Sequence, residues 1–271
     1  MAVPDVSARA LPELWSLAGR RAVVTGGARG IGRAIAERFA EAGAALVLGD
    51  LDLPAAEAAA AALAARHGRP AHALAVEVAD AASVAALADA ALARLGGLDV
   101  WVNNAGIYPS APALEIDAAE WDRVIAVNVR GCFLGAQAAA RRMVAAGRGG
   151  VIVNIASTGC VKAAPGVAHY VTSKHAVVGI TKSLAVELGP QGIRVLAVAP
   201  SMTHTEGRAA FLERYTTPAM RALLAEMEGR VPLGRIGVAD DVARVALFAA
   251  SDAAVLMTGS VLFVDAGESA L

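Results

Sequence analysis

Tyr170 and Lys174 lie four residues apart in a segment predicted to be helical, so their side chains project from one face. A tyrosine hydroxyl ordinarily ionises at a pH of about 10. A neighbouring ammonium favours the phenolate and lowers the pKa of the tyrosine. A tyrosine placed in this way can exchange a proton with an alcohol near neutral pH. Taken alone, the pair is more typical of an exposed helix surface.

Two further polar residues complete a candidate catalytic group. Ser157 follows the apolar run Val151–Ile155, and its hydroxyl can hold a substrate oxygen beside Tyr170 because it both donates and accepts hydrogen bonds. Asn128 lies inside the long predicted helix Ala118–Ala146, where asparagine is unfavourable. We interpret Asn128 as a candidate to hold a water for a proton relay. The alternatives are a turn serine and a core amide with satisfied hydrogen bonds.

A glycine-rich turn joins the predicted strand Arg21–Thr25 to the predicted helix Ile31–Ala42. Glycine lets a backbone turn tightly and approach a pyrophosphate closely, and a helix N-terminus offers unpaired N–H groups to that anion. In this strand–turn–helix context the spacing predicts a dinucleotide site rather than an ordinary turn. Its predicted residues are Gly26, Arg29, Gly30, Ile31 and Gly32.

Asp50 follows the second predicted strand, Ala45–Gly49. An acidic side chain there can accept hydrogen bonds from both adenosine ribose hydroxyls and would repel a 2′-phosphate. The next residue, Leu51, is not an arginine, so the pair favours NAD over NADP. Arg29 weighs slightly the other way, because its cation could help to bind a 2′-phosphate. The alternative for Asp50 is a solvated carboxylate that caps the next helix.

The whole chain alternates short apolar runs with longer helical patterns. Near-continuous apolar strands are typical of a parallel sheet buried on both faces, so we predict an α/β fold with a doubly wound, parallel, seven-stranded sheet and helices on both faces. Residues 1–17 form a predicted frayed tail, and residues 18–271 a single domain with a lid over residues 201–235, which contains the helical patterns Arg208–Tyr215 and Met220–Glu228. The predicted strands are Arg21–Thr25, Ala45–Gly49, His72–Val76, Val100–Asn103, Val151–Ile155, Val195–Ala199 and Val261–Val264, and the remaining predicted helices are Ala55–His67, Ala82–Leu95, His175–Leu188 and Ala239–Ala250.

Composition narrows the class of protein. The net charge is −1, which gives no attraction to nucleic acid or to an anionic membrane. We find no secretory signal and no apolar run long enough to span a bilayer, so we expect a cytoplasmic protein. Cys132 and Cys160 are too few for a disulfide framework and lack metal-ligand spacing. We therefore expect no metal and interpret both cysteines as core residues.

Several motifs in one order resemble the short-chain dehydrogenase/reductase family, from about Leu17 to Gly267. The gap of 13 residues between Ser157 and Tyr170 is the usual one in that family. The motifs that carry the resemblance are Thr25–Gly32, Asn103–Gly106, Asn128, Ser157, Tyr170–Lys174, Pro200–Thr205 and Val264–Gly267.

The resemblance implies a Rossmann fold and a role for each matching residue. Tyr170 would be the acid/base, Lys174 would lower its pKa and hold the nicotinamide ribose, Ser157 would orient the substrate, and Asn128 would anchor the relay water. Further cofactor contacts implied in this way are Asn104, Ala105 and Gly106 on the adenosine side and Pro200, Ser201, Thr203 and Thr205 near the nicotinamide.

Three positions depart from the family pattern. Glu77-Val78 stands where an aspartate usually meets adenine, and we expect Glu77 to make that contact in its place. Ala199-Pro200-Ser201 replaces Asn-Pro-Gly, and Ala266-Gly267 replaces Gly-Gly. None of these changes removes a catalytic group.

The expected substrate wall is mainly apolar or aromatic, and we see no arginine cluster in it for a phosphate or carboxylate. The segments Ile107-Tyr108-Pro109, Ala199-Pro200-Ser201 and His169-Tyr170 together resemble those of NAD-dependent 1-phenylethanol-type dehydrogenases. The apolar wall predicts an apolar secondary alcohol or ketone, aromatic and cyclic ones included. His204 is either an exposed loop histidine or a group that contacts the substrate or senses pH. The predicted substrate residues are Ile107, Tyr108, Ser157, Thr158, His169, Met202 and His204.

Two other functions remain open at this point. One is an NADPH-dependent 3-oxoacyl thioester reductase, and the other is a non-catalytic nucleotide-binding protein on the same fold. The resemblance also implies a homotetramer or homodimer, assembled through the helices Ala118–Ala146 and His169–Leu188 and the C-terminal strand.

Overall fold

The computed structural model describes residues 4–229 and 231–270, so Met1–Val3 of the predicted tail, Arg230 of the predicted lid and Leu271 lie outside the described residues. Seven parallel strands form one sheet in the order β3-β2-β1-β4-β5-β6-β9, which confirms the predicted fold class. The strands are β1 Arg21–Thr25, β2 Ala45–Asp50, β3 Ala71–Ala75, β4 Val100–Asn103, β5 Gly150–Ile155, β6 Ile193–Pro200 and β9 Val261–Val264.

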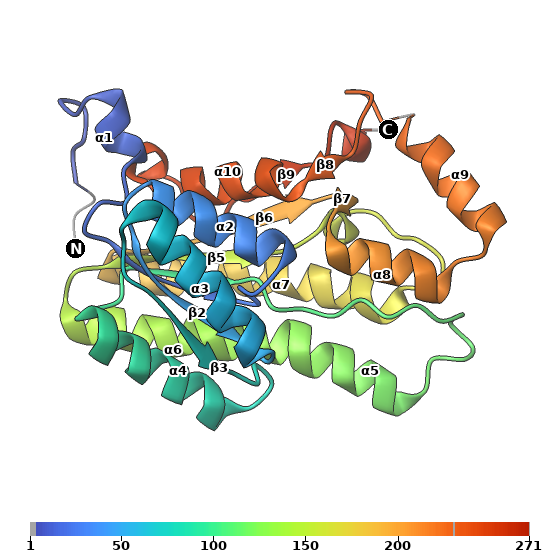
Figure 1. The fold of residues 1–271 in the computed structure, drawn as a ribbon, viewed down its shortest axis with the longest axis horizontal. Helices are drawn as coiled ribbons and strands as arrows, with labels where there is room; N and C mark the ends of the chain where they lie inside the picture. The colour runs from blue at the N-terminus through green and yellow to red at the C-terminus, as the bar shows by residue number, and fades with distance from the viewer. Residues whose placement is uncertain (1–3, 230, 271) are drawn as a thin grey trace.

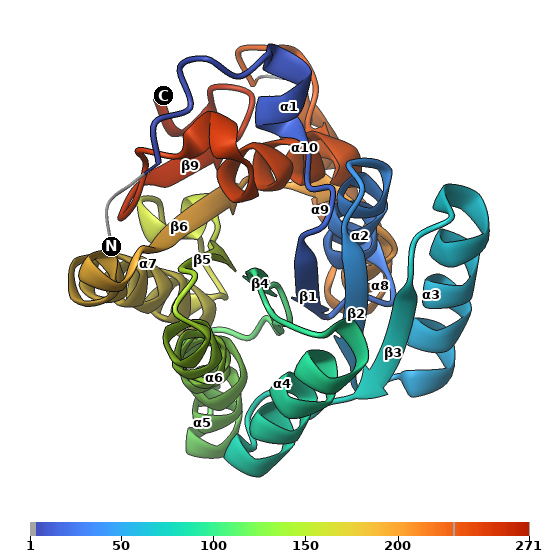
Figure 2. The same ribbon diagram turned by 90° about the vertical axis from the view of Figure 1, so that its left-hand side faces the viewer.

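Helices cover both faces of this sheet (Figure 2). Their apolar residues pack against the strands, whose side chains are buried on both faces because the sheet is parallel and the helical connections cross over both of its faces. One face is covered by α2 Gly30–Glu41, α3 Leu53–His67 and α10 Ala239–Ala250, and the other by α4 Ala81–Leu95, α6 Gly131–Ala146 and α7 Ala168–Leu188.

The stretch predicted as one helix, Ala118–Ala146, is helical throughout but not uniform. It consists of α5 Ala118–Ile125, a π-helical turn Ala126–Arg130, and α6. A π turn inside a helix redirects side chains and backbone groups. The turn contains the buried Asn128, the residue whose type was unfavourable for a regular helix.

The N-terminal segment is more ordered than the frayed tail that we predicted. It forms a short helix, α1 Leu11–Trp15, and the Trp15 ring lies 5.7 Å from the ring of Phe248 on α10. Arg9 forms an ion pair of 2.5 Å with Asp252, and Leu17 is buried in the core. The prediction failed because these partners lie more than two hundred residues away in the sequence.

The predicted lid contains two helices, α8 Glu206–Tyr215 and α9 Pro218–Glu228, close to the predicted ranges. They lie beside the ends of the sheet strands (Figure 1). A short pair of parallel strands, β7 Thr203–His204 and β8 Gly237–Val238, joins the two ends of the segment.

A chain of buried polar side chains crosses the structure behind this edge. Trp101 Nε1 donates to Asn103 Oδ1 over 2.7 Å, and Asn103 Nδ2 donates to Asn154 Oδ1 over 2.9 Å. Asn154 Nδ2 then donates to Thr181 Oγ1 on α7 over 2.9 Å. Because buried polar groups are costly when unpaired, this chain fixes β4, β5 and α7 relative to one another.

Gly135 on α6 packs directly against this polar chain. A Cβ at Gly135 would lie 2.1 Å from Asn103 Oδ1, whereas a Cβ at Gly179 on α7 has no heavy atom within 4 Å. We expect Gly135→Ala to lower the free energy of unfolding by about 1–3 kcal/mol. The control Gly179→Ala should raise it by about 0.5–1 kcal/mol. Urea unfolding measures both, and equal effects of the two variants would contradict the close contact.

Candidate active site

The predicted site residues gather at the carboxyl edge of the sheet. Strands β1 and β4 are neighbours there although β2 and β3 separate them in the sequence. At such a switch point the connections leave in opposite directions and open a crevice, which is where ligands bind in open α/β sheets.

The glycine-rich turn lies at this crevice and opens helix α2. Gly26 adopts a φ of 64°, and a Cβ at Gly32 would lie 2.1 Å from the Gly26 carbonyl oxygen. Only glycine fits both conditions. Helix α2 begins at Gly30, and its N-cap residue Arg29 makes no side-chain hydrogen bond to the first N–H groups, which makes this helix start a cradle suited to a pyrophosphate.

Asn104 braces the turn from below. Its Nδ2 donates to the Thr25 and Gly26 carbonyl oxygens over 2.9 and 3.0 Å. The Thr25 hydroxyl oxygen accepts from the backbone N–H groups of Asn104 and Ala105. Thus Asn104 and Ala105 fix the shape of the cradle from beneath.

Asp50 ends β2 beside the same turn. One carboxylate oxygen accepts from the Ala28 N–H over 3.0 Å and the other from the Asp52 N–H over 3.1 Å. Each oxygen retains a lone pair for a ribose hydroxyl. Arg29 forms an ion pair with Asp52, and Leu51 is exposed. The cation that could have favoured a 2′-phosphate is therefore held by another carboxylate.

The two residues after β3 differ in exposure. Glu77 is exposed, and its Oε1 accepts from the Ala79 N–H over 3.0 Å. One carboxylate oxygen of Glu77 is therefore used to stabilise the turn of residues 77–79. Val78 is buried against Gly131, the first residue of α6. Val78 therefore offers a wall rather than a polar contact.

Ser157, Tyr170 and Lys174 come together as predicted. Lys174 lies 5.6 Å from the centre of the Tyr170 ring, and its ammonium donates to the Ile155 carbonyl oxygen over 2.8 Å. Burial raises the pKa of Tyr170 above its ordinary value and outweighs a hydrogen bond with Ser157 that lowers it, so the expected lowering of this pKa by Lys174 is not found in this structure. The Ser157 hydroxyl oxygen also accepts from the Gly159 N–H over 3.0 Å, which directs its proton away from the backbone.

The side-chain amide of Asn128 is occupied by protein partners, and the relay water that we expect at this residue stays a prediction. Its Nδ2 donates to the Ile107 carbonyl oxygen over 2.8 Å and to Ser173 Oγ over 3.0 Å, and its Oδ1 accepts from the Ile107 N–H over 2.9 Å. A Cβ at Gly106 would lie 3.2 Å from that oxygen. The Asn128 amide instead joins the segment before Tyr108 to helix α7.

The expected position of His169 in the substrate wall is wrong. Its side chain has 0% exposed surface, so it cannot contact a ligand in the crevice. The imidazole lies between the Tyr170 backbone and Glu120 of α5. Ser173 and Glu120 were both missed, although Ser173 precedes Lys174 directly and lies one helical turn from Tyr170.

Aromatic rings form the wall around Tyr170. The Tyr108 ring lies 6.2 Å from the Tyr170 ring in an edge-on arrangement and 5.6 Å from the ring of Phe211 on α8. Ile107 is held by Asn128, and Thr158 is buried behind Ser157. The lid helix α8 thus packs against the wall through Phe211, a residue that the sequence analysis had not singled out individually.

The segment after β6 closes the crevice on its other side. Ser201 follows Pro200, and its N–H donates to the Val264 carbonyl oxygen over 3.2 Å. Met202 is half-buried, and the buried Thr203 donates its hydroxyl to the Ser201 carbonyl oxygen. Thr205 caps helix α8 by accepting from the Arg208 N–H over 3.1 Å. The hydroxyls of Thr203 and Thr205 therefore stabilise the lid base in this structure.

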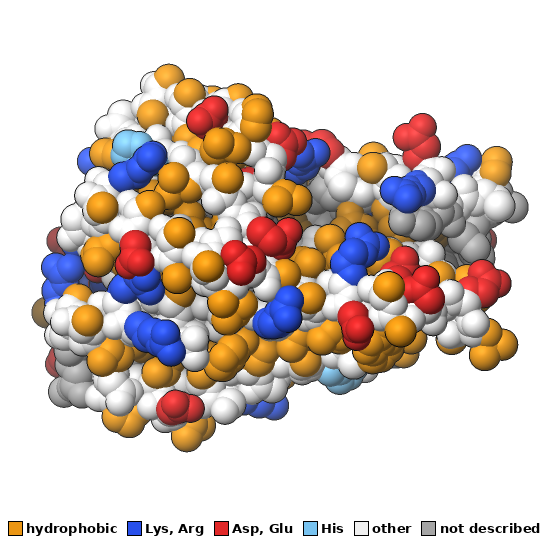
Figure 3. All heavy atoms as spheres, turned by 90° about the horizontal axis from the view of Figure 1, so that it is seen from below, with side chains coloured by type: hydrophobic (Ala, Val, Ile, Leu, Met, Phe, Trp, Pro, Cys, Tyr) orange, Lys and Arg blue, Asp and Glu red, His pale blue; other side chains and the backbone are white. Residues whose placement is uncertain are grey.

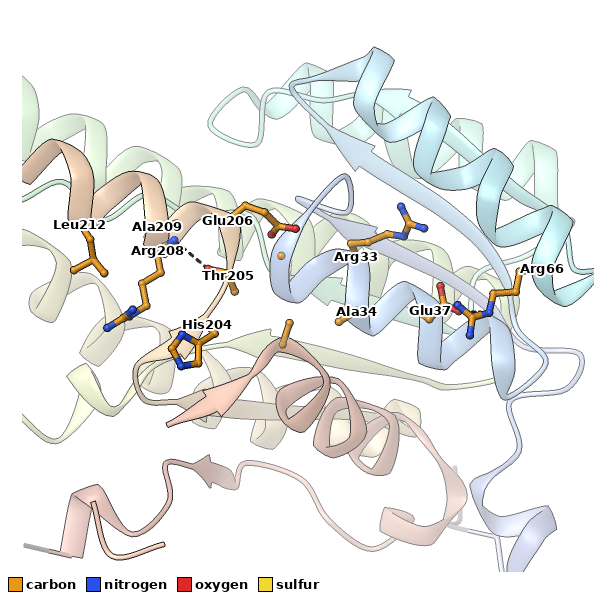
Figure 4. A pocket seen from close by; sticks show the side chains of 12 residues that line it. Arg33, Ala34, Glu37, Arg66, His204, Thr205, Glu206, Arg208, Ala209 and Leu212 are labelled. Atoms are coloured by element: carbon orange, nitrogen blue, oxygen red, sulfur yellow. Dashed lines mark hydrogen bonds and ion pairs between the residues drawn. The ribbon is translucent and has the colours of Figure 1, made fainter. Parts of the chain in front are cut away.

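A cleft of about 720 Å³ separates α2 from the lid (Figure 4). His204 is exposed in this cleft on the lid side, and Arg33 and Arg66 line the opposite side. Ser157, Tyr170 and Lys174 do not line it. His204 therefore lies at a cleft that these three residues do not line, and its contact with a substrate stays a prediction.

Within residues 4–229 and 231–270, the structure contains no cluster of three or more histidine, cysteine, aspartate or glutamate side chains arranged to hold a metal ion. The same residues include no helix that is long and apolar enough to cross a membrane.

Comparison with known proteins gives the class of this fold and site. A family model described as enoyl-(acyl carrier protein) reductase matches residues 26–269. The D-threitol dehydrogenase of Mycolicibacterium smegmatis is 42% identical over 93% of this chain and 94% of its own length. The chain belongs to the short-chain dehydrogenase/reductase family of oxidoreductases.

Two further relatives show the range of proteins that this chain is similar to. The 4-formylbenzenesulfonate dehydrogenase TsaC1/TsaC2 of Comamonas testosteroni is 43% identical over 92% of this chain and 97% of its own length. A gluconate 5-dehydrogenase from Burkholderia cenocepacia J2315, solved with NADP and tartrate, superposes with a TM-score of 0.88 at 36% identity, covering 97% of this chain and all of that one.

The buried ammonium of Lys174 should make the free energy of unfolding depend on pH. Burial lowers the pKa of Lys174 from 10.5 to about 8, so between these values the unfolded chain binds a proton that the folded chain does not. The free energy of unfolding therefore rises with pH over this window. Lys174→Met removes the cost of burying the charge and should be more stable than the parent chain at pH 7 by about 1–3 kcal/mol.

Denaturant unfolding at pH 7 and pH 10.5 measures this effect, which should disappear at the higher pH. Lys182→Met on the exposed side of α7 is the matched control and should change stability by less than about 0.5 kcal/mol. A Lys174→Met protein that is less stable at pH 7 would contradict the assigned desolvation.

Proposed function

We propose that the protein is an NAD-dependent dehydrogenase or reductase that interconverts an apolar secondary alcohol and its ketone, aromatic and cyclic ones included. One observation carries the proposal: the hydroxyls of Ser157 and Tyr170 lie beside an aromatic wall, with the buried Lys174 ammonium beneath them. The glycine-rich cradle and Asp50 lie at the same sheet edge.

Each residue of the catalytic group has a separate role in the proposed reaction. Tyr170 exchanges the proton of the substrate oxygen, and Ser157 holds that oxygen by a hydrogen bond. Lys174 supplies a positive charge that favours the Tyr170 phenolate. Asn128 acts on the substrate wall and on α7 through its amide. A bound nicotinamide dinucleotide would accept or supply the hydride.

The proposal of NAD rests on Asp50. The carboxylate is fixed by two backbone N–H groups, so it cannot move away from a 2′-phosphate without losing both bonds. Arg29 pairs with Asp52, and Leu51 offers no charge. Among the remaining predicted contacts, one oxygen of Glu77 is used within its own turn, and we propose that the other faces adenine.

The proposal of an apolar substrate rests on Ile107, Tyr108 and Phe211. The Tyr108 ring packs against both Tyr170 and Phe211, which lies on α8, and Ile107 precedes Tyr108 in the loop that Asn128 holds. The relatives named above include one with an aromatic substrate and others with polyhydroxylated ones. The two tyrosine rings, packed edge-on, favour the aromatic side of that range.

The thioester reductase is the alternative within the family, since the matching family model carries an acyl carrier protein in its description. It would use NADPH, which Asp50 opposes. A non-catalytic nucleotide-binding role is opposed by the convergence of Ser157, Tyr170 and Lys174, because nucleotide binding alone gives no reason to bury an ammonium.

We also propose a homotetramer or homodimer in a reducing cytoplasm. Large apolar side chains are exposed on the two helices expected at the interfaces and on β9, among them Trp121, Phe133, Val186 and Phe263. Figure 3, which faces α4, α5 and α6, shows hydrophobic side chains gathered between charged ones. Cys132 and Cys160 are unpaired and buried, and burial raises the pKa of both thiols, that of Cys132 to about 12, which disfavours the reactive thiolate form.

Steady-state turnover tests the proposed reaction. We expect aryl and cyclic secondary alcohols to reduce NAD with higher kcat/KM than polyols or 3-hydroxyacyl thioesters. Tyr170→Phe should lower kcat by about 10²–10⁴-fold, because it removes the proton donor while keeping the ring. Full turnover by Tyr170→Phe, or a clear preference for thioesters with NADPH, would overturn the assignment.

Cofactor choice tests Asp50 separately. In the double variant Asp50→Ser with Leu51→Arg, the ratio of kcat/KM for NAD to that for NADP should fall by about 100-fold, equivalent to roughly 2.7 kcal/mol. Glu57→Ser, a nearby acidic position on α3, serves as the control and should leave the ratio unchanged. A parent enzyme that already prefers NADP would show that Asp50 does not face the ribose.

A further inference from the structure

We propose that His169 is a positioning residue that caps helix α7 and thereby fixes the backbone of Tyr170. The inference rests on the proposed role of Tyr170 as the acid/base. It concerns a side chain that the crevice does not reach, since His169 has no exposed surface.

Helix α7 begins at Ala168 with an end that lacks the usual cap. The first N–H groups of a helix have no partner inside it and are commonly satisfied by a serine, threonine, aspartate or asparagine at the preceding position. Here that position is Val167, whose side chain cannot accept a hydrogen bond. The Val171 N–H donates to the Val167 carbonyl oxygen over 2.9 Å, so the Tyr170 N–H is the last one without a partner inside the helix.

The imidazole of His169 supplies the missing acceptor. Its Nδ1 accepts from the Tyr170 N–H over 2.9 Å. Because Nδ1 accepts, the ring proton of the neutral imidazole lies on Nε2. Nε2 lies 3.2 Å from Glu120 Oε1 on α5 and donates to it. Glu120 is itself tied into the first turn of α5, where its N–H donates to Asp117 Oδ1.

The other end of the Tyr170 peptide is held from the same direction. Ser173 Oγ donates to the Tyr170 carbonyl oxygen over 2.6 Å and accepts from Asn128 Nδ2 over 3.0 Å. Asn128 and Glu120 belong to one continuous helical stretch, α5 and the π turn. This stretch therefore fixes the backbone of Tyr170 on both sides of its Cα. His169 holds the N–H group, and Ser173 holds the carbonyl oxygen.

These hydrogen bonds to the Tyr170 backbone matter because proton exchange depends on where the Tyr170 hydroxyl lies. A displacement of about 1 Å in a reacting group can lower a rate by roughly 100-fold. His169 cannot change the chemistry directly. Loss of the His169 side chain should lower kcat, because it releases the first turn of α7. The KM of the enzyme for NAD should stay the same, because the glycine-rich cradle lies on other elements.

Two polar variants separate the cap from mere packing. In His169→Asn the amide oxygen can take the place of Nδ1 and accept from Tyr170, whereas in His169→Gln the amide can take the place of Nε2 and reach only Glu120. We expect His169→Asn to keep kcat within about threefold of the parent, and His169→Gln and His169→Leu to lose about 10- to 100-fold. The KM for NAD should stay within about twofold in all three.

His175→Leu is the matched control, because this exposed histidine lies on the same helix and bonds only to the Val171 carbonyl oxygen. It should leave kcat unchanged. Thermal unfolding of every variant establishes that the compared proteins are folded, and the His169→Asn and His169→Gln pair remains informative if His169→Leu does not fold.

The outcomes distinguish the two claims. Equal kcat in His169→Asn and His169→Gln, or an unchanged kcat in His169→Leu, overturns the capping role while Tyr170→Phe still loses turnover. A fully active Tyr170→Phe protein overturns the proposed function and the inference together.

Discussion

The active-site edge depends on one buried amide, that of Asn128. Its side chain binds both the N–H and the carbonyl oxygen of Ile107 and also the hydroxyl of Ser173. These three bonds tie together a loop after β4, the π turn and helix α7. A buried amide with its donors satisfied holds such segments strongly, because breaking one bond leaves a polar group unpaired in the interior. The aromatic wall and the catalytic helix consequently keep one relative position.

The sheet supplies the other constraint. Parallel strands bring their carboxyl ends to one edge, and the order of β1 and β4 opens a crevice there. Asn104 reaches from the end of β4 to the glycine-rich turn after β1, so the cofactor cradle and the catalytic half share a connection. The chain of buried hydrogen bonds from Trp101 to Thr181 fixes β4, β5 and α7 behind the active-site edge.

Charge at the site is arranged at a cost to stability. The ammonium of Lys174 is buried with a carbonyl oxygen as its hydrogen-bond acceptor, and burial lowers its pKa to about 8. The pKa of Tyr170 is raised by the same burial. A positive charge near a buried phenol favours the phenolate more strongly than it would in water, since the local dielectric is low. Burial of the Lys174 ammonium thus lowers the stability of the fold but favours release of the Tyr170 proton, a common compromise in enzymes.

Much of the fold and of the site could be predicted from the sequence. Strands buried on both faces are almost wholly apolar, and the run Val100–Asn103 matches β4 residue for residue. The spacing of Tyr170 and Lys174 places them on one helix face wherever that helix lies. The glycine-rich turn was recognisable because Gly32 admits no side chain.

The failures share a physical cause. The sequence does not show which long-range partner a polar side chain finds. His169 was predicted to contact the substrate, yet its ring lies against Glu120, 49 residues away. The side-chain partners of Asn128 lie 21 and 45 residues away, and no local pattern indicates them. His204 lies in β7, a strand of two residues whose pairing with β8 no local pattern predicts.

Transfer of an isotope tests the central claim most directly. A secondary aryl alcohol carrying deuterium on its carbinol carbon is incubated with NAD and the protein, and the nicotinamide product is analysed by mass spectrometry. If the chain transfers a hydride between the carbinol carbon and NAD, the reduced cofactor gains the deuterium in a single step. Reduced cofactor without the label, or no reduced cofactor with any alcohol of the panel, would contradict the account.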